Sequence, residues 1–191
     1  MARDKELVQL KRQHTMRLGK LLARSYYLHQ RKRKREMYNL ICDEFVALGG
    51  VYVKFLQGVL LTNPVFRDWQ SRDRLKIFED LDPEPLDIVA VLRREIKPEQ
   101  LKEISLVQPE PFAAGSFGQV YLGQHRNGNK IVIKALRPQM RALLKHDLKL
   151  IGVFSRHFVK NNYENMDVNM DNAIQEFREA TLRETDYISE A

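Results

Sequence analysis

Cysteine is almost absent from the sequence, since Cys42 is the one example among 191 residues. A single thiol excludes an internal disulfide and a metal site built from several cysteines. We interpret Cys42 as a small buried hydrophobic residue in a protein of a reducing compartment.

Long apolar runs are missing as well. The longest stretch without a charge, residues 55–66, is flanked by Lys54 and Arg67 and is too short to cross roughly 30 Å of hydrocarbon. Charges interrupt residues 1–35 too often for the apolar core of a secretory signal. We therefore expect a cytoplasmic protein without a transmembrane segment, and a peripheral contact with a membrane stays open.

The net charge of +7 is distributed unevenly. Residues 1–35 hold twelve Lys and Arg against two acidic residues, a net +10, which leaves −3 for the rest of the chain. Such a segment fits an anionic lipid surface or a nucleic acid, and it equally fits the solvated face of a helix. No aromatic-rich basic strand or known reader motif supports nucleic-acid binding, so we expect no nucleic-acid partner.

Apolar periodicity predicts helices through the first part of the chain. The predicted helices cover residues 3–30, 36–61, 66–78, 86–96 and 98–104. The first is basic and amphipathic, and Asn63-Pro64 ends the second. Gly50 and Gly58 on the second helix are expected to let another element pack closely against it.

Strand character begins near Ser105. The predicted strands cover residues 106–107, 119–123 and 131–136. Asn127-Gly128 predicts a hairpin with a type I′ turn, because this dipeptide accepts positive φ at both positions. Two more helices are predicted over residues 139–159 and from 167 to the end. The fold class is therefore α+β, with a basic segment (1–35), a helical extension (36–104) and a small lobe built around an antiparallel sheet (105–191).

A turn of small residues lies between the first two of these strands. Small side chains let backbone N–H groups approach phosphate oxygens, and a lysine on a later strand supplies a positive charge, as in kinase-type nucleotide sites. The predicted nucleotide-binding residues are Ala113, Ala114, Gly115, Ser116, Phe117, Gly118, Val120 and Lys134. A plain β-turn beside a surface lysine is the alternative.

Lys134 interrupts the apolar run 131–136. Burying an ammonium group without a partner costs several kcal/mol, so we expect a carboxylate or phosphate partner. The candidate carboxylates are Glu184 and Glu190, near the end of the chain.

Lys54 is a second lysine within an apolar stretch, and on a helix it shares a face with Gln57. The alternative is a lysine whose charged end reaches solvent from a half-buried helix. Glu184, Asp186 and Glu190 place three carboxylates close together. Such a run is often a solvated face, but Glu184 falls on the apolar stripe of its helix, which favours a buried ionic partner.

The catalytic residues of phosphoryl transfer are missing from the sequence. There is no Asp-Phe-Gly to hold Mg²⁺. Lys145-His146-Asp147 imitates a catalytic loop, but it lacks the residue between His and Asp and falls in a predicted helix, so we reject it. We expect the metal ligands beyond residue 191, no metal site in this chain, and no catalysis by this chain alone.

The chain resembles the N-terminal half of the UbiB/AarF family of atypical kinases over residues 40–191. The matching motifs are Lys54-Phe55-Leu56-Gln57 (Lys-x-Gly-Gln), Ala113-Ala114-Gly115-Ser116 (the alanine-rich loop), Lys134 (the strand lysine), Glu184-Thr185-Asp186 (Glu-x-Asp) and Glu190-Ala191 (Glu-Ala). Leu56 replaces a glycine of the family, and Gly115 replaces an alanine. We expect Gly115 to give the loop a more ordinary kinase geometry, because glycine reaches backbone conformations that alanine does not.

The resemblance implies a kinase-like small lobe that ends before the large lobe, with ATP and Mg²⁺ as cofactors. It implies that Lys54 reaches Glu184 and Asp186 across the nucleotide pocket and that Lys134 pairs with Glu190 as the catalytic lysine. It also implies an atypical kinase or ATPase of ubiquinone or other isoprenoid-lipid metabolism at a membrane. A pseudokinase-like scaffold of a lipid-biosynthesis complex is the second hypothesis, and a nucleic-acid-binding protein led by the basic segment is the third.

Overall fold

The chain folds as an α+β protein, as the sequence predicts. The computed structural model describes residues 2–62, 82–162 and 170–185, which fall into two compact units. Met1–Ser71 and Arg141–Ala191 form the first, which we call the helical unit. Arg72–Met140 form the second, which we call the sheet unit. The predicted helix over 66–78 lies outside the described residues.

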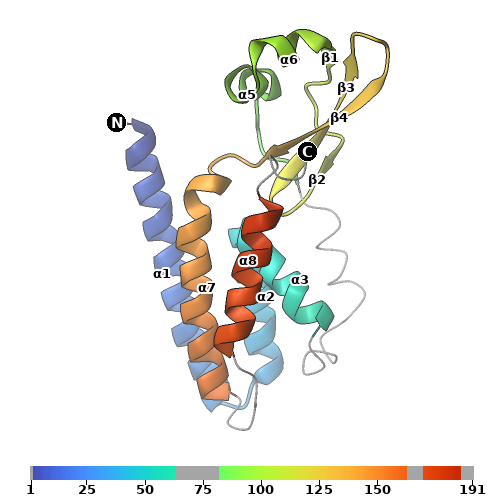
Figure 1. The fold of residues 1–191 in the computed structure, drawn as a ribbon. Helices are drawn as coiled ribbons and strands as arrows, with labels where there is room; N and C mark the ends of the chain where they lie inside the picture. The colour runs from blue at the N-terminus through green and yellow to red at the C-terminus, as the bar shows by residue number, and fades with distance from the viewer. Residues whose placement is uncertain (1, 63–81, 163–169, 186–191) are drawn as a thin grey trace. The chain divides into compact units, whose positions relative to one another are not determined.

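The helical unit contains α1 (Ala2–Gln30), α2 (Lys34–Leu48), α3 (Gly50–Thr62), α7 (Met140–Asn162) and α8 (Met170–Glu184) (Figure 1). The prediction of one helix over 36–61 is wrong. Gly49 ends α2 with a positive φ of 71°, and its N–H donates to the carbonyls of Phe45 and Val46. A residue with a Cβ disfavours this conformation, so the glycine turns the chain between α2 and α3.

The core of the helical unit is rich in aromatic rings. Phe45 is fully buried, and its ring centroid lies 5.4 Å from that of Tyr52 and 5.1 Å from that of Phe154. The ring of Phe55 meets that of Phe177 at 5.3 Å, which joins α3 to α8. Cys42 is buried, as predicted.

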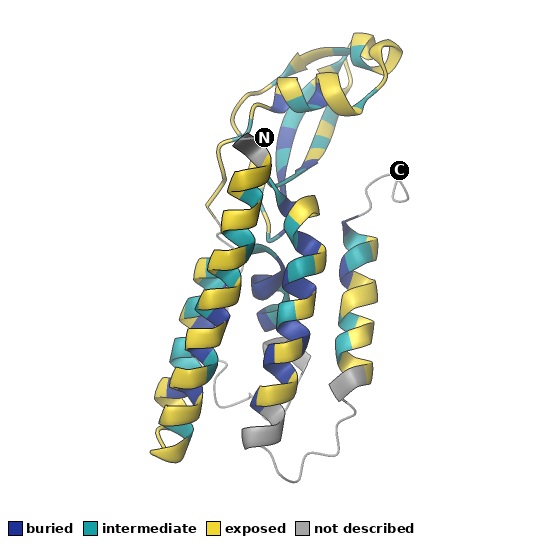
Figure 2. Ribbon diagram, turned by 90° about the vertical axis from the view of Figure 1, so that its left-hand side faces the viewer, coloured by how far each residue is buried: buried dark blue, intermediate teal, exposed yellow. Residues whose placement is uncertain are grey.

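The predicted amphipathic character of the first helix is confirmed, and α7 likewise buries one stripe. Their buried members are Leu18, Leu21 and Ser25 on α1 and Met140, Leu144, Leu148, Ile151 and Phe154 on α7. In Figure 2, α1, which starts at the N-terminus, has a mostly exposed outer surface along its length. Gly58 does not support the expected close packing, because a Cβ placed there would meet nothing within 4 Å.

The sheet unit contains α5 (Ile88–Glu95), α6 (Pro98–Glu103), β1 (Ile104–Val107), β2 (Ala113–Ala114), β3 (Gly118–His125) and β4 (Lys130–Leu136). All pairings are antiparallel, and β3 lies in the middle: β4 pairs along one edge, while β1 and β2 share the other. Pro109 and Pro111 fall between β1 and β2. Proline has no N–H for the ladder, so it interrupts this edge.

The two faces of the sheet differ. One face packs on α5 and α6 through a core of Ile88, Leu92, Tyr121 and Ala135, with Ile133 against it. The opposite face keeps large apolar side chains exposed, among them Leu106 (55%) and Val132 (68%). Among the described helices of the sheet unit, α5 and α6 cover one face and none covers the other, which we call the uncovered face.

The hairpin between β3 and β4 is where predicted, but its turn is not type I′. Gly128 has a φ of 89°, whereas Asn127 does not have a positive φ. Gly128 N–H donates to the carbonyl of His125 (2.9 Å), and His125 N–H donates to that of Asn129 (2.8 Å). The loop therefore has three residues, and Gly128 alone adopts the left-handed conformation. Three-residue loops are the commonest hairpin connections after two-residue loops.

Candidate functional site

The predicted phosphate loop is a tight turn between β2 and β3. Gly115 N–H donates to the carbonyl of Gly118 at 2.8 Å, so Ser116 and Phe117 occupy the tip. The short strand β2, which the sequence analysis treated as loop, orients Ala113 and Ala114 beside β3. Phe117 is buried and anchors the turn in the sheet unit.

Gly115 does not use a conformation reserved for glycine. Its φ lies outside the left-handed region, and a Cβ built on it would lie 3.8 Å from the nearest atom, the carbonyl oxygen of Gly118. An alanine therefore fits here. The expected change in loop geometry at this position finds no support in the backbone of the described turn.

Three predicted nucleotide-binding residues line up across the uncovered face of the sheet. Ala113 on β2 is opposite Val120 on β3, and Val120 is opposite Lys134 on β4. Directly opposite residues of an antiparallel pair point to the same face. The row therefore combines a small residue, an apolar residue and a cation next to the Gly115–Gly118 turn.

Lys134 is exposed, so the argument from its burial is wrong. Side chains alternate along β4, and Lys134 shares the outward face with Lys130 and Val132 rather than the core face of Ile133. This alternation between the two faces could not be recognised in the sequence, because residues 131–133 before Lys134 are all apolar. Of its predicted partners, Glu184 contacts Lys54 instead, and Glu190 lies outside the described residues.

Arg137, directly after β4, makes three side-chain contacts in the sheet unit. Its Nε donates to the carbonyl of Gly115 (2.8 Å), its Nη1 to the Glu84 carboxylate (2.9 Å) and its Nη2 to the carbonyl of Asp82 (3.0 Å). Its backbone N–H donates to the carbonyl of Phe117 (2.9 Å). The sequence analysis did not predict these contacts.

The side chain of Gln119 is buried beneath this network. Its Oε1 accepts from the backbone N–H of Glu84, and its Nε2 donates to the carbonyl of Glu84 (3.1 Å) and to the Tyr121 hydroxyl (2.9 Å). Burial raises the pKa of the Tyr121 hydroxyl. A glutamine between apolar strand residues was the available signal for this role.

Lys54 and Glu184 form an ion pair in the helical unit. Lys54 Nζ lies 2.9 Å from Glu184 Oε1 and 2.8 Å from Oε2, so the contact joins α3 to α8. The two side chains are 34% and 38% exposed. Gln57 is partly buried one turn further along α3. Asp186, the other predicted partner, lies outside the described residues.

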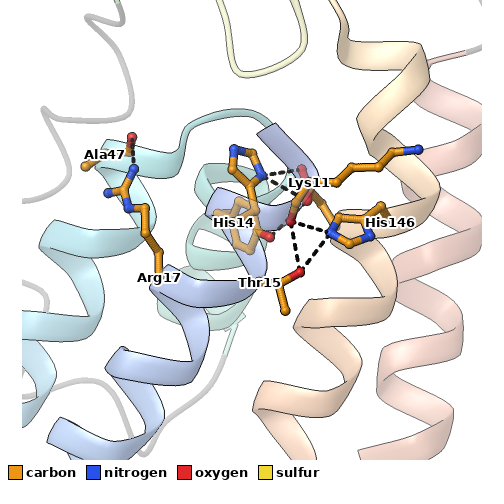
Figure 3. Close-up of polar contacts among 8 residues, drawn as sticks. Lys11, His14, Thr15, Arg17, Ala47 and His146 are labelled. Atoms are coloured by element: carbon orange, nitrogen blue, oxygen red, sulfur yellow. Dashed lines mark hydrogen bonds and ion pairs between the residues drawn. The ribbon is translucent and has the colours of Figure 1, made fainter. Parts of the chain in front are cut away.

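The catalytic-loop imitation Lys145-His146-Asp147 lies within α7 and holds α1 in place. Asp147 is buried and accepts from His14 Nδ1 (3.0 Å) and from the Tyr52 hydroxyl (3.1 Å). His146 Nε2 donates to the carbonyl of Lys11 (3.1 Å) and lies 3.3 Å from Thr15 Oγ1 (Figure 3). Burial, together with Asp147, raises the pKa of Tyr52 far above its ordinary value.

Among the described residues there is neither a metal centre nor a membrane-spanning helix. No group of three or more His, Cys, Asp or Glu side chains in residues 2–62, 82–162 and 170–185 is placed to hold a metal ion. Within the same ranges, no helix combines the length and the apolar character needed to cross a bilayer.

The fold and the row of site residues together define an α+β protein with a kinase-like small lobe. The model of the ABC1 atypical kinase-like domain matches residues 78–191, which is more than half of the chain. The chain therefore belongs to the ABC1 family of atypical kinase-like proteins, in agreement with the resemblance found in its sequence.

Individual relatives agree with this assignment. The chain is 29% identical over 162 residues to the Arabidopsis thaliana chloroplastic protein named ACTIVITY OF BC1 COMPLEX KINASE 1, covering 83% of this chain and 23% of the relative. It is 25% identical over 146 residues to the probable protein kinase UbiB of Azotobacter vinelandii, covering 75% of this chain and 27% of the relative. The chain thus spans about a quarter of the length of these relatives.

A comparison with solved structures found a Mycobacterium tuberculosis protein in complex with erythromycin. The TM-score is 0.44 at 18% identity, and the match covers 83% of this chain and 40% of that one.

Proposed function

We propose that this chain is the nucleotide-binding half of an atypical kinase or ATPase. One observation carries the proposal: Ala113, Val120 and Lys134 form a row on the uncovered sheet face, next to the turn Gly115–Gly118. Apolar side chains suit the flat face of a base, and an exposed lysine suits phosphate oxygens. The turn adds backbone N–H groups without bulky side chains at its two ends.

The row fits ATP better than an uncharged ligand, because Lys134 supplies a positive charge at its end. ATP when bound supplies the phosphoryl group for transfer or hydrolysis. As the family resemblance implies, we propose that Mg²⁺ accompanies ATP, with ligands beyond Ala191. The catalytic roles proposed in this chain are limited to Lys134, with Glu190 as its partner.

The ion pair between Lys54 and Glu184 supports a second part of the proposal. Both belong to motifs that the family resemblance marked, together with Gln57 and Asp186, and the pair links α3 to α8 at 2.8 Å. We propose that these residues regulate how the protein binds or turns over the nucleotide. Their contact holds two helices together but does not belong to the row of Ala113, Val120 and Lys134.

We further propose a role in ubiquinone or other isoprenoid-lipid metabolism at a membrane, as the family resemblance implies. The outer surface of α1 supports membrane contact: Val8, Met16, Tyr26 and Tyr27 are exposed among basic residues, and the sequence holds no acidic residue from 7 to 35. Basic helices with exposed apolar and aromatic side chains bind anionic bilayers. Sedimentation with anionic and neutral vesicles, beside an oligonucleotide, tests this contact. Binding only the oligonucleotide would contradict it.

The nucleotide proposal is tested by titrating the complete protein with ATP, using Lys134→Met and the control Lys130→Met. Both lysines are exposed on the same face of β4, but only Lys134 is in the row with Val120. We expect Lys134→Met to weaken ATP binding about tenfold or more, the usual scale for losing a charge-assisted contact, and Lys130→Met to leave it within about twofold. Equal effects of the two substitutions would contradict the proposed site. ATP turnover that needs Mg²⁺ would exclude the scaffold hypothesis.

A further inference from the structure

The guanidinium of Arg137 connects two segments that are far apart in the sequence. One acceptor, the carbonyl of Gly115, belongs to the phosphate loop, and the other two belong to Asp82 and Glu84 before α5. The side chain of Arg137 is only 10% exposed. A nearly buried cation is stable only where its charge is compensated and its donors are used, and the Glu84 carboxylate and the two carbonyls meet both needs.

The far end of this bridge is itself fixed. Gln119 binds both the N–H and the carbonyl of Glu84, and its own amide donates to Tyr121 in the core of the sheet unit. Gln119 and Tyr121 are fully buried. The backbone of Glu84 is therefore held in place by Gln119, and its partly exposed carboxylate receives Arg137 from this fixed position.

The contact with Gly115 determines the direction of a loop amide. The described peptide bonds are trans, so the N–H of Ser116 points opposite to the carbonyl of Gly115 in the same peptide plane. Because Arg137 Nε holds that carbonyl, the Ser116 N–H is directed away from Arg137. The backbone N–H of Arg137 also holds the carbonyl of Phe117, which fixes the other side of the tip.

We propose that Arg137 is a positioning residue that keeps the phosphate loop in the conformation that receives phosphate. This inference rests on the proposed function, because it assigns a ligand, the phosphate groups of a nucleotide, to the oriented Ser116 N–H. Backbone N–H groups held in one direction bind anions without a further cost of ordering the loop. Arg137 does not touch the nucleotide itself; it acts through the carbonyl of Gly115.

Lysine does not replace arginine in this role. The three acceptors lie in three directions around a planar fork, and an ammonium group at the end of a flexible stem does not reproduce that geometry. We therefore expect Arg137→Lys to behave like Arg137→Gln for phosphate binding, although it keeps the charge. Glu84→Gln keeps the backbone contacts with Gln119 and is expected to have a smaller effect than either.

The test compares ATP with adenosine as probes in the complete protein. We expect Arg137→Gln and Arg137→Lys to weaken ATP binding about tenfold, while adenosine binding changes less than about twofold, because only the phosphates use the loop. Arg126→Gln is the matched control, since Arg126 is an exposed arginine in the distant β3–β4 hairpin of the same unit. We expect it to change neither affinity.

Hydrogen exchange supplies a readout that does not depend on binding. In Arg137→Gln the Gly115 amide, which donates to the carbonyl of Gly118, should exchange at least about tenfold faster, while the amides of β3 and β4 keep their protection. ATP binding within twofold of wild type, an equal loss of ATP and adenosine, or unchanged exchange at Gly115 would each overturn the role of Arg137. A wild-type protein that binds neither probe would instead overturn the proposed function.

Discussion

The helical unit and the sheet unit use polar contacts in different ways. In the helical unit, several contacts that join helices run between side chains distant in sequence, such as His14 with Asp147 and Lys54 with Glu184, 133 and 130 residues apart, beside the contact of His146 with the Lys11 carbonyl. In the sheet unit, Arg137 and Gln119 direct most of their contacts to backbone atoms. Side-chain pairs align whole helices, whereas contacts to the backbone fix the path of the main chain, which a phosphate site requires.

The largest effect is expected in the aromatic core of the helical unit. Phe45→Ala should lower the free energy of unfolding by about 3–5 kcal/mol, because it removes a fully buried ring that touches several others. Urea denaturation measures the loss. Phe112→Ala is the control, since that ring is 70% exposed, and should stay within about 0.5 kcal/mol. If Phe45→Ala also released the amides of β3 and β4, the division into two units would be wrong.

Gly123 offers the corresponding substitution in the sheet unit. A Cβ there would lie 2.9 Å from the carbonyl oxygen of Leu106 and 3.1 Å from Ile131, so the strands must separate to accept it. We expect Gly123→Ala to lower the free energy of unfolding by about 1–3 kcal/mol. Gly115→Ala, where the nearest atom is 3.8 Å away, should change it by less than about 0.5 kcal/mol. Equal losses would refute the packing described around Gly123.

Asp147 tests the attachment of α1. Asp147→Ala leaves the Nδ1–H of His14 and the hydroxyl of Tyr52 without their acceptor, which should cost about 1–3 kcal/mol. We expect faster hydrogen exchange in α1, with the sheet unit unchanged. Asp43→Ala removes an exposed carboxylate from α2 of the same unit and serves as the control. Unchanged exchange in α1 would show that this contact does not hold the helix.

The buried hydroxyl of Tyr52 makes the stability of the helical unit depend on pH in the alkaline range. An unfolded tyrosine ionises near pH 10, whereas the pKa of Tyr52 in the folded chain is raised by burial and by Asp147. The contribution of the neutral hydroxyl to the free energy of unfolding is therefore complete below pH 10. It decreases as the pH rises above 10, because the unfolded chain ionises first. Between pH 10 and 11, wild type should lose about 1 kcal/mol more than Tyr52→Phe, which keeps Tyr121 as an internal reference. Parallel pH profiles would contradict the buried hydroxyl.

The smallest effect on stability is expected for the pair Lys54 and Glu184. Both side chains are about one third exposed, so water screens the pair, and Lys54→Met should cost less than about 1 kcal/mol. A double-mutant cycle with Glu184→Gln measures the coupling. If ATP binding or turnover changes far more than stability, the pair acts on function, as proposed. If the loss of stability accounts for the whole change in ATP binding or turnover, the pair of Lys54 and Glu184 has only a structural role.

Local patterns in the sequence predicted much of this structure. The apolar stripes of α1 and α7, the strands β3 and β4 and the hairpin at Asn127-Gly128 all depend on neighbours in the sequence. The break at Gly49 was missed because the apolar pattern continues through it. The exposure of Lys134 was missed because apolar residues precede it on both faces of β4.

The remaining features depend on contacts between distant residues. The helical position of Asp147 was predicted, but its partners His14 and Tyr52 come from α1 and α3. The contacts of Arg137 with Glu84 and Asp82 join residues 53 and 55 positions apart, and no periodicity marks them. The loop was therefore predictable from its residues, whereas the network that holds the loop required the structure.

The central claim is that the uncovered sheet face with its adjoining turn is the nucleotide site. Hydrogen exchange of the complete protein with and without ATP tests it most directly. We predict that ATP slows exchange at Ser116 and in the segment of β4 around Lys134, with smaller changes in α1 and α2. Protection confined to the helical unit, or ATP binding without any change at the turn, would contradict the claim.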